Sequence, residues 1–230
     1  MLLPPSTPSL PFDLRGAAAN AAAATFLPPT APTPNRSHTH PPAPRYKLDD
    51  HIGCVVAGLT ADANLLIGEA RVMAQRHLYT YQEPMPVEQL VKRVCDLKHS
   101  YTQFGSLRPF GVSFLVAGHD KYLGHQLYMS DPSGNFSAWK ATCIGKNNPA
   151  GKSLLKSDYT EGASIQECLK LAAKVMNKTM DTTAPSAEKI EFFTLTRDAE
   201  GNNVHTILPD AEVTALLAAV ELEGGDAGDE

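Results

Sequence analysis

The sequence predicts a layered α+β protein in which helices cover antiparallel strands. Three observations support this fold class. Short β-branched runs bounded by glycine recur along the chain, amphipathic helical patterns come in two pairs, and a meander of strands separates these pairs. Because the helices stand apart from the strands instead of alternating with them, the order favours α+β over a doubly wound parallel sheet.

Composition limits the possible functions. The 230 residues are 43% hydrophobic, which is enough for one domain with a sizeable core and a tail. The net charge of -5 and the absence of clustered lysine and arginine argue against nucleic-acid and membrane-surface partners. The apolar runs are also much shorter than the roughly 20 residues that a membrane span needs.

The cysteine pattern predicts neither a disulfide framework nor a zinc site. The four cysteines lie far apart in the sequence, without CxxC spacing: Cys54, Cys95, Cys143 and Cys168. We interpret them as reduced core cysteines of a cytosolic or nuclear protein, and we expect no cofactor and no metal. His38 and His40, in a proline-rich stretch, are interpreted as incidental.

Residues 1–44 differ in composition from the rest of the chain. They hold eleven of the 18 prolines and a single acidic residue, Asp13. Such a segment buries too little apolar surface to offset about 1 to 2 kcal/mol of backbone entropy per residue, so we expect disorder. The alternatives are a targeting segment, which the two basic residues Arg15 and Arg36 support poorly, and a gene-model artefact.

The first ordered elements follow from Tyr46 onward. HIGCVVAGL (51–59) suits a buried strand, and the apolar repeat from Leu65 to Tyr79 predicts a helix with Asp62 in its first turn. A second helix with a continuous apolar stripe is expected from Val87 to Tyr101, after Pro86.

A meander and a second helix pair come next. Strands are predicted over 110–118, 123–130 and 135–143, the last two joined by the turn DPSG. Helices are expected from Asn148, as N-cap before Pro149, and after the capping box of Ser164 and Glu167. A hairpin of 190–196 with 204–208 and a short helix from Pro209 complete the order.

Three motifs occur in order along the middle of the chain: RPFG (108–111), SDPSG (130–134) and ATCIG (141–145). In this order and spacing they resemble the alpha-type subunits of the 20S proteasome, and the resemblance extends from Tyr46 to about Leu216. It implies the N-terminal-nucleophile hydrolase fold, an αββα sandwich of two antiparallel sheets with helix pairs on both outer faces.

The resemblance also implies that this domain is incomplete at its N-terminus. Family members carry an N-terminal helix with a YD...FSPxGRLxQVEYA signature, followed by two strands of the types TxxGI and DGVxLAAE, and this sequence has none of them. We therefore expect a domain at 45–216 that lacks its first helix and first two strands, and an acidic tail at 217–230. Unpaired strand edges would weaken a fold whose total stability is only about 5 to 15 kcal/mol.

The function implied by the resemblance is that of a non-catalytic ring subunit. Its partners would be neighbouring alpha subunits, the beta ring and proteasome activators, in ubiquitin-dependent protein degradation. The catalytic beta subunits use a threonine after a glycine, a pair that this chain lacks. Gly53-Cys54 mimics it, so one alternative is a self-processing amidohydrolase using Cys54. The others are a truncated fragment that no longer assembles, and a fragment that binds one alpha neighbour and blocks ring closure.

One binding site follows from the resemblance, residue by residue. Alpha subunits receive activator C-termini with a Gly-Leu pair, which matches Gly58 and Leu59, and with a lysine whose position falls at Pro44. The cation is therefore missing, and we expect no normal activator pocket. The sequence places no catalytic partner near three further candidate histidines, which are interpreted as surface or capping groups: His77, His99 and His119.

Overall fold

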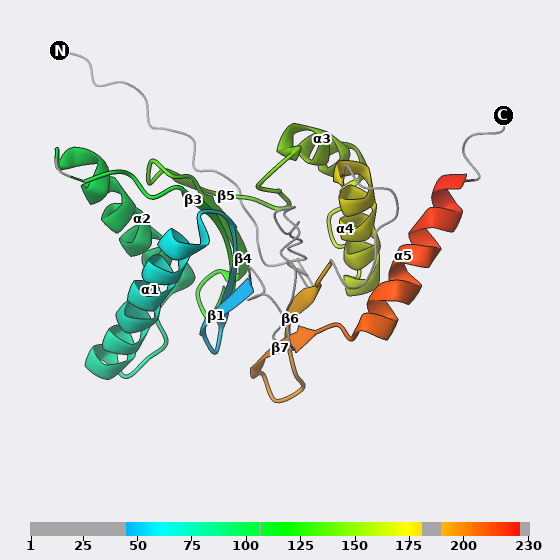
Figure 1. Ribbon diagram of the computed structural model, residues 1–230. Coiled ribbons are helices and arrows are strands. Elements are labelled where there is room, and N and C mark those ends of the chain that lie inside the picture. Colours follow the sequence, from blue (N-terminus) through cyan, green and yellow to red (C-terminus); the bar gives the residue numbers. More distant parts are fainter. Residues whose placement is uncertain (1–44, 106, 181–189, 226–230) are drawn as a thin grey trace, which may run out of the picture.

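The protein is layered, as its sequence predicts. The structure is a computed structural model that describes residues 45–105, 107–180 and 190–225. Figure 1 shows four successive layers: a pair of helices, a large sheet, a small sheet and a second group of helices. This is the αββα arrangement, and both sheets are antiparallel.

The large sheet is a regular meander of five strands in the order β1-β2-β3-β4-β5. The long central strands pair without a bulge: Ile52 lies opposite Gly118 in one pair of strands, and His119 lies opposite His125 in the next. The strands are β1 (Arg45–Asp49), β2 (Ile52–Gly58), β3 (Val112–Asp120), β4 (Gly124–Ser130) and β5 (Phe136–Ala138). β2 and β3 are almost fully buried because helices cover one face of the sheet and the second half of the molecule covers part of the other.

Helices α1 (Thr60–Tyr81) and α2 (Val87–Gln103) pack on the outer face of this sheet. Their buried positions recur at helical spacing, and in α1 many of these positions are alanine, which permits close approach to the strands. The buried side chains of both helices and those of β2 and β3 that face them form the largest hydrophobic core of the described residues.

The second half contains β6 (Phe193–Arg197) and β7 (Asn203–Ile207), with helices α3 (Asn148–Asp158), α4 (Ile165–Thr179) and α5 (Asp210–Gly225) outside them. α4 begins with the predicted capping box: the Ser164 side chain accepts a hydrogen bond from Glu167 N–H, and the Glu167 side chain accepts one from Ser164 N–H. A separate core joins α4 and α5 to the residues before β6.

Several boundaries differ from those that the sequence predicted, among them the starts of β3 and β6, which begin at Val112 and Phe193. α3 is preceded by Asn147, in the left-handed conformation that asparagine tolerates, so Asn148 is the first helical residue and not the N-cap. The third strand ends at Ala138, because the chain then leaves the sheet to reach α3.

The prediction that an acidic tail begins at residue 217 is also wrong. Helix α5 continues to Gly225, because Leu217 and Val220 are buried in the core shared with α4 and so favour the helix over an extended tail. The expectation of disorder in 1–44 lies outside the described residues.

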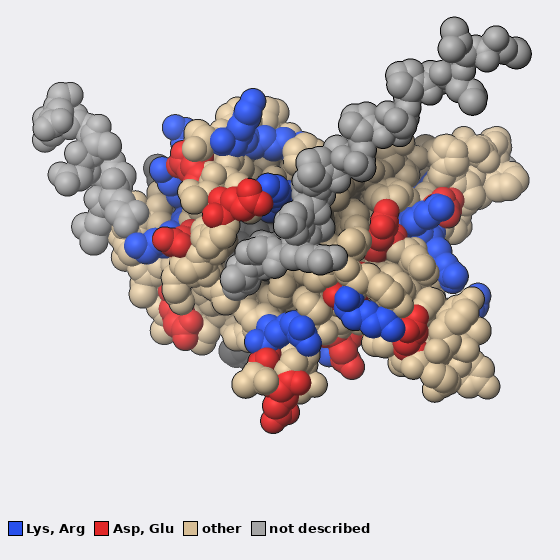
Figure 2. Space-filling model, turned by 180° about the vertical axis from the view of Figure 1, so that it is seen from behind, with Lys and Arg blue, Asp and Glu red and all other residues tan. Residues whose placement is uncertain are grey.

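The surface agrees with the charge pattern of the sequence. Among the described residues on the face shown in Figure 2, basic side chains are interspersed with acidic ones. Within the same part of the chain, no helix has both the length and the apolar character required to cross a bilayer.

Candidate functional site

The predicted Gly58–Leu59 pair lies where β2 turns into α1. Gly58 has a φ of 128°, a conformation that L side chains rarely adopt. Leu59 N–H donates to the carbonyl of Gly111 at 2.9 Å, and the Leu59 carbonyl accepts from Ala63 N–H at 3.1 Å. The glycine thus lets the chain pass directly over the backbone at the end of RPFG, and Leu59 becomes the N-cap of the helix.

Asp62 fixes this junction from inside the first turn of α1. Its carboxylate accepts hydrogen bonds from both terminal nitrogens of Arg108, at 2.7 and 2.8 Å, and from Gly111 N–H at 2.9 Å. The Arg108 guanidinium, followed by the Gly111 N–H, lowers the pKa of Asp62 to about 2. The RPFG motif therefore has a structural role, since its arginine and its glycine both bind the carboxylate next to Leu59.

The junction presents an apolar side chain on a fixed backbone. Leu59 is 54% exposed, although the backbone on either side of it is held by hydrogen bonds. Arg108, the cation that lies against the junction, is already engaged by Asp62. Pro44, at the position where the resemblance places a lysine, lies outside the described residues. The geometry suits an apolar contact with a partner better than capture of a free carboxylate.

We predict that Asp62→Asn lowers the free energy of unfolding at pH 7 by about 1 to 2 kcal/mol, after allowance for solvent screening of Arg108. The folded-state pKa is depressed, so the stability from Asp62 is present above about pH 4 and is lost as the pH falls towards 2. Urea unfolding at pH 7 and below pH 3 measures this difference between wild type and variant, which should shrink in acid.

Glu69→Gln is the matched control, because Glu69 is an exposed carboxylate on the same helix. It should change the unfolding free energy by less than about 0.5 kcal/mol at either pH. An Asp62→Asn difference that stayed constant through the acid range would contradict the assigned role of the charge.

Cys54 does not have the properties of a nucleophile. It lies in the middle of β2, paired with Tyr46 on one side and Val116 on the other, and its exposed fraction is 0%. Burial raises the pKa of its thiol to about 12, so the thiol is protonated at neutral pH. A cleavage before Cys54 would also cut a central strand of the large sheet. The structure therefore argues against the amidohydrolase alternative.

The histidines considered in the sequence do not form a site together. His77 is buried and stacks on Tyr81 with ring centroids 4.5 Å apart, so its expected surface role is wrong. His99 contacts Gln103 at 3.0 Å, and His119 pairs with His125 across β3 and β4. Within the described ranges, no group of three histidine, cysteine, aspartate or glutamate residues is arranged to hold a metal ion.

The four cysteines, all in described parts of the chain, are not joined by disulfides. Cys54 and Cys95 are buried in the first core, whereas Cys143 and Cys168 are half-buried and border a cavity between the large sheet and α4. The expectation for His38 and His40 lies outside the described residues.

Lys98 is a buried ionisable group that the sequence did not reveal, because it occupies a core position within a polar stretch of α2. Its ammonium donates to the Val112 carbonyl at 3.1 Å, the Ser130 hydroxyl at 2.9 Å and the Asp131 carbonyl at 3.2 Å. It also lies 4.6 Å from the centre of the Phe114 ring. Burial lowers its pKa to about 8. The lysine thus ties α2 to the start of β3 and to the SDPSG turn.

The fold and the site define a protein with the N-terminal-nucleophile hydrolase sandwich. The family model described as "Proteasome subunit" matches residues 45–195, and the chain belongs to this family. The sandwich expected from the resemblance is thereby confirmed.

Individual relatives are named as alpha type-4 subunits. The chain is 61% identical over 147 residues to proteasome subunit alpha type-4-A of Arabidopsis thaliana. This match covers 64% of the chain and 59% of the relative. It is 52% identical over 179 residues to proteasome subunit alpha type-4 of Dictyostelium discoideum, covering 77% and 71%. The spinach alpha type-4 subunit is also 61% identical over 147 residues. The chain thus spans 59% of the length of its Arabidopsis and spinach relatives.

Proposed function

We propose that the chain is a non-catalytic structural subunit of the alpha ring of the 20S proteasome core particle. The observation that carries this proposal is the 52–61% identity to subunits named alpha type-4. In this role it would contact neighbouring alpha subunits and the beta ring, and help to control substrate entry in ubiquitin-dependent degradation. We place it in the cytoplasm and the nucleus, whose reducing environment is compatible with four cysteines that form no disulfide in the described part of the chain.

The absence of catalysis is part of the proposal. Cys54 supports it, because a fully buried thiol with a raised pKa in a central strand is not available to a substrate. A non-catalytic subunit would act through the surfaces by which it contacts other proteins. Leu59 is the residue that we assign to contact with activators, with Gly58 setting its position. With Pro44 at the position of the family's lysine, this contact would hold an activator carboxylate only weakly.

Native mass spectrometry of an affinity-tagged full chain, purified from cells, tests the assembly proposal. We expect the tagged chain in a particle that also contains alpha and beta subunits. Recovery of the chain only as a monomer, as an aggregate or with chaperones would contradict ring assembly and would favour a fragment that does not assemble.

A pair of variants makes this test specific for the surface. Leu59 and Leu65 are both about half exposed near the start of α1, so Leu59→Glu and Leu65→Glu introduce the same charge at neighbouring places. If Leu59 contacts activators, Leu59→Glu should weaken co-purification of an activator with the assembled particle, while Leu65→Glu should not. Equal effects would remove the assignment of Leu59 but leave ring assembly intact.

A further inference from the structure

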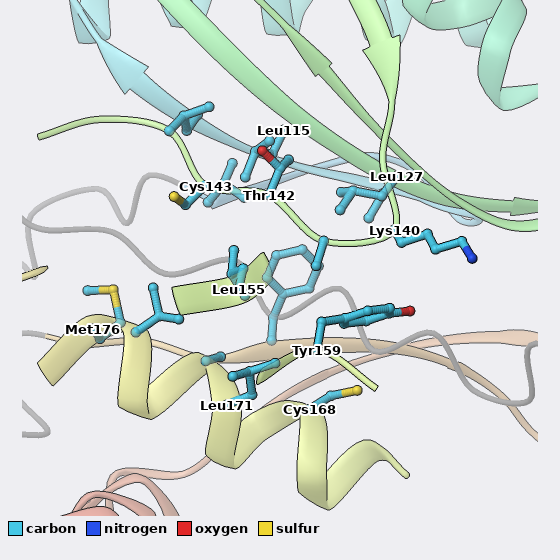
Figure 3. Close-up of a pocket in the computed structure, with 17 residues that line it drawn as sticks. Leu115, Leu127, Lys140, Thr142, Cys143, Leu155, Tyr159, Cys168, Leu171 and Met176 are labelled. Carbon is cyan, nitrogen blue, oxygen red and sulfur yellow. The ribbon is translucent and has the colours of Figure 1, made fainter. Parts of the chain in front are cut away.

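A surface groove lies beside the apolar cavity between the large sheet and α4. It has a volume of about 530 Å³ and is lined by the end of β5, the connection from β5 to α3, and one face of α3. Lys140, Leu155 and Tyr159 belong to the walls of both hollows. Figure 3 shows the polar ends of Lys140 and Tyr159 directed away from Met176, which lies at the far end of the cavity. The groove is therefore the polar, outward side of this shared wall.

Trp139 provides an apolar surface in the groove. It is the only tryptophan of the sequence and is 40% exposed, although tryptophan is highly buried on average. Its indole N–H donates to the Ser137 hydroxyl at 2.7 Å, so the polar group of the ring is already satisfied. The ring surface is what remains available to a ligand, and tryptophan is among the residues that contribute most to protein interfaces.

The positive charge of the groove comes from two lysines of α3. Lys152 and Lys156 are four residues apart and therefore lie on the same face of the helix. The Lys152 ammonium is 5.5 Å from the centre of the Trp139 ring, which places one of the two charges beside the aromatic surface. Neither lysine forms an ion pair with a carboxylate of the described residues.

The neighbouring carboxylates are engaged by other cations. Glu161 pairs with Lys140 at 2.7 Å, and Asp158 pairs with Lys174 at 2.6 Å. Asp158 is also the one acidic residue in the sequence of α3. The charge of the two groove lysines is therefore not neutralised locally, and an acidic ligand complements it.

We propose that this groove binds an extended acidic segment of a partner protein, with an apolar side chain on the Trp139 ring and carboxylates on Lys152 and Lys156. Four residues of helix separate the two lysines by about 6 Å along the axis. Alternate side chains of an extended chain lie on the same side at about 6.6 Å. The two acids are therefore expected at positions i and i+2, with the apolar residue next to one of them. This binding does not depend on assembly into a ring.

The test uses the full chain and a synthetic peptide with the core leucine-aspartate-serine-aspartate-leucine. This core reads the same in both chain directions, so either direction places a leucine beside Trp139. The peptide contains no aromatic residue, and the emission of Trp139 therefore reports directly on the groove. We expect a saturable change in this emission, and binding that is at least tenfold weaker for a control peptide with asparagine at both acid positions. Added salt should weaken binding of the acidic peptide.

A pair of charge reversals locates the binding place. Lys156 is exposed on α3, so Lys156→Glu should weaken binding of the acidic peptide at least tenfold without disturbing the core. Lys92→Glu is the matched control, because Lys92 is an exposed lysine of α2, on the other side of the large sheet, and this variant should bind as wild type does. Equal losses in both variants would show an effect of total charge and not of the groove.

Three further results would overturn the proposal. Equal binding of the aspartate and asparagine peptides would show that the lysines do not recognise the ligand. The absence of a saturable change in Trp139 emission would show that no peptide occupies the groove. A single-stranded oligonucleotide of the same net charge should bind more weakly than the acidic peptide, and tighter binding would assign the groove to nucleic acid instead.

Discussion

Replacement of Lys98 by methionine is expected to lower the free energy of unfolding by about 3 kcal/mol. The lysine has an exposed fraction of 0% and donates to three oxygens, those of Val112, Ser130 and Asp131. Methionine retains much of the buried volume but leaves these acceptors without their donor. An unsatisfied buried polar group costs about 1 to 3 kcal/mol, so partial relaxation of the three still leaves a large loss.

Urea unfolding of wild type and Lys98→Met measures this loss. Lys92→Met is the matched control, because Lys92 is an exposed lysine on the same helix and its replacement should change the unfolding free energy by less than about 0.5 kcal/mol. Similar small effects of both substitutions would show that water or backbone movement satisfies the three oxygens, and that Lys98 is not needed to hold the SDPSG turn.

Gly58→Ala is expected to cost at least about 3 kcal/mol, because the substitution combines steric conflict with an unfavourable backbone conformation. A Cβ at this position would lie 2.2 Å from the Gly111 carbonyl oxygen and 3.0 Å from the Cα of Val112. These are backbone atoms of a neighbouring strand, so no side-chain rotation relieves the conflict. The φ of 128° adds strain for any L residue.

Gly68→Ala provides the control in the same part of the chain. Gly68 lies within α1, and a Cβ there would meet no atom within 4 Å. Alanine favours the helix interior over glycine by about 1 kcal/mol, so this variant should be more stable than wild type. Chemical denaturation of both variants measures the two changes in unfolding free energy. A Gly58→Ala protein as stable as wild type would show that the end of β2 can move away from the Gly111 carbonyl without loss of stability.

The two substitutions affect the proposed contact with activators differently. A shift of the backbone at Gly58 would displace Leu59 from the Gly111 carbonyl that holds it, whereas Gly68 lies away from this junction. A stability loss in Gly58→Ala together with weaker activator binding would therefore connect the fold of the junction to its surface.

The sequence predicted much of the candidate site but not its chemistry. Gly58 and Leu59 followed from the family resemblance, and RPFG served only to identify that resemblance. The sequence places Asp62 in the first turn of a helix, whereas the structure shows it bound to Arg108, 46 residues later. No local spacing indicates such a pair, because the two residues meet only when α1 packs against the start of β3.

The sequence alone determined the elements of this protein, because helices and strands depend on local periodicity, capping and turn residues. The capping box of Ser164 and the helix after Pro86 are examples. Only the tertiary structure decided which polar groups are buried and which of them are paired. The burial of Lys98 and the pairing of Asp62 with Arg108 depend on contacts between segments far apart in the chain. The free energy of those contacts is set by burial and by hydrogen-bond geometry, which no local pattern records.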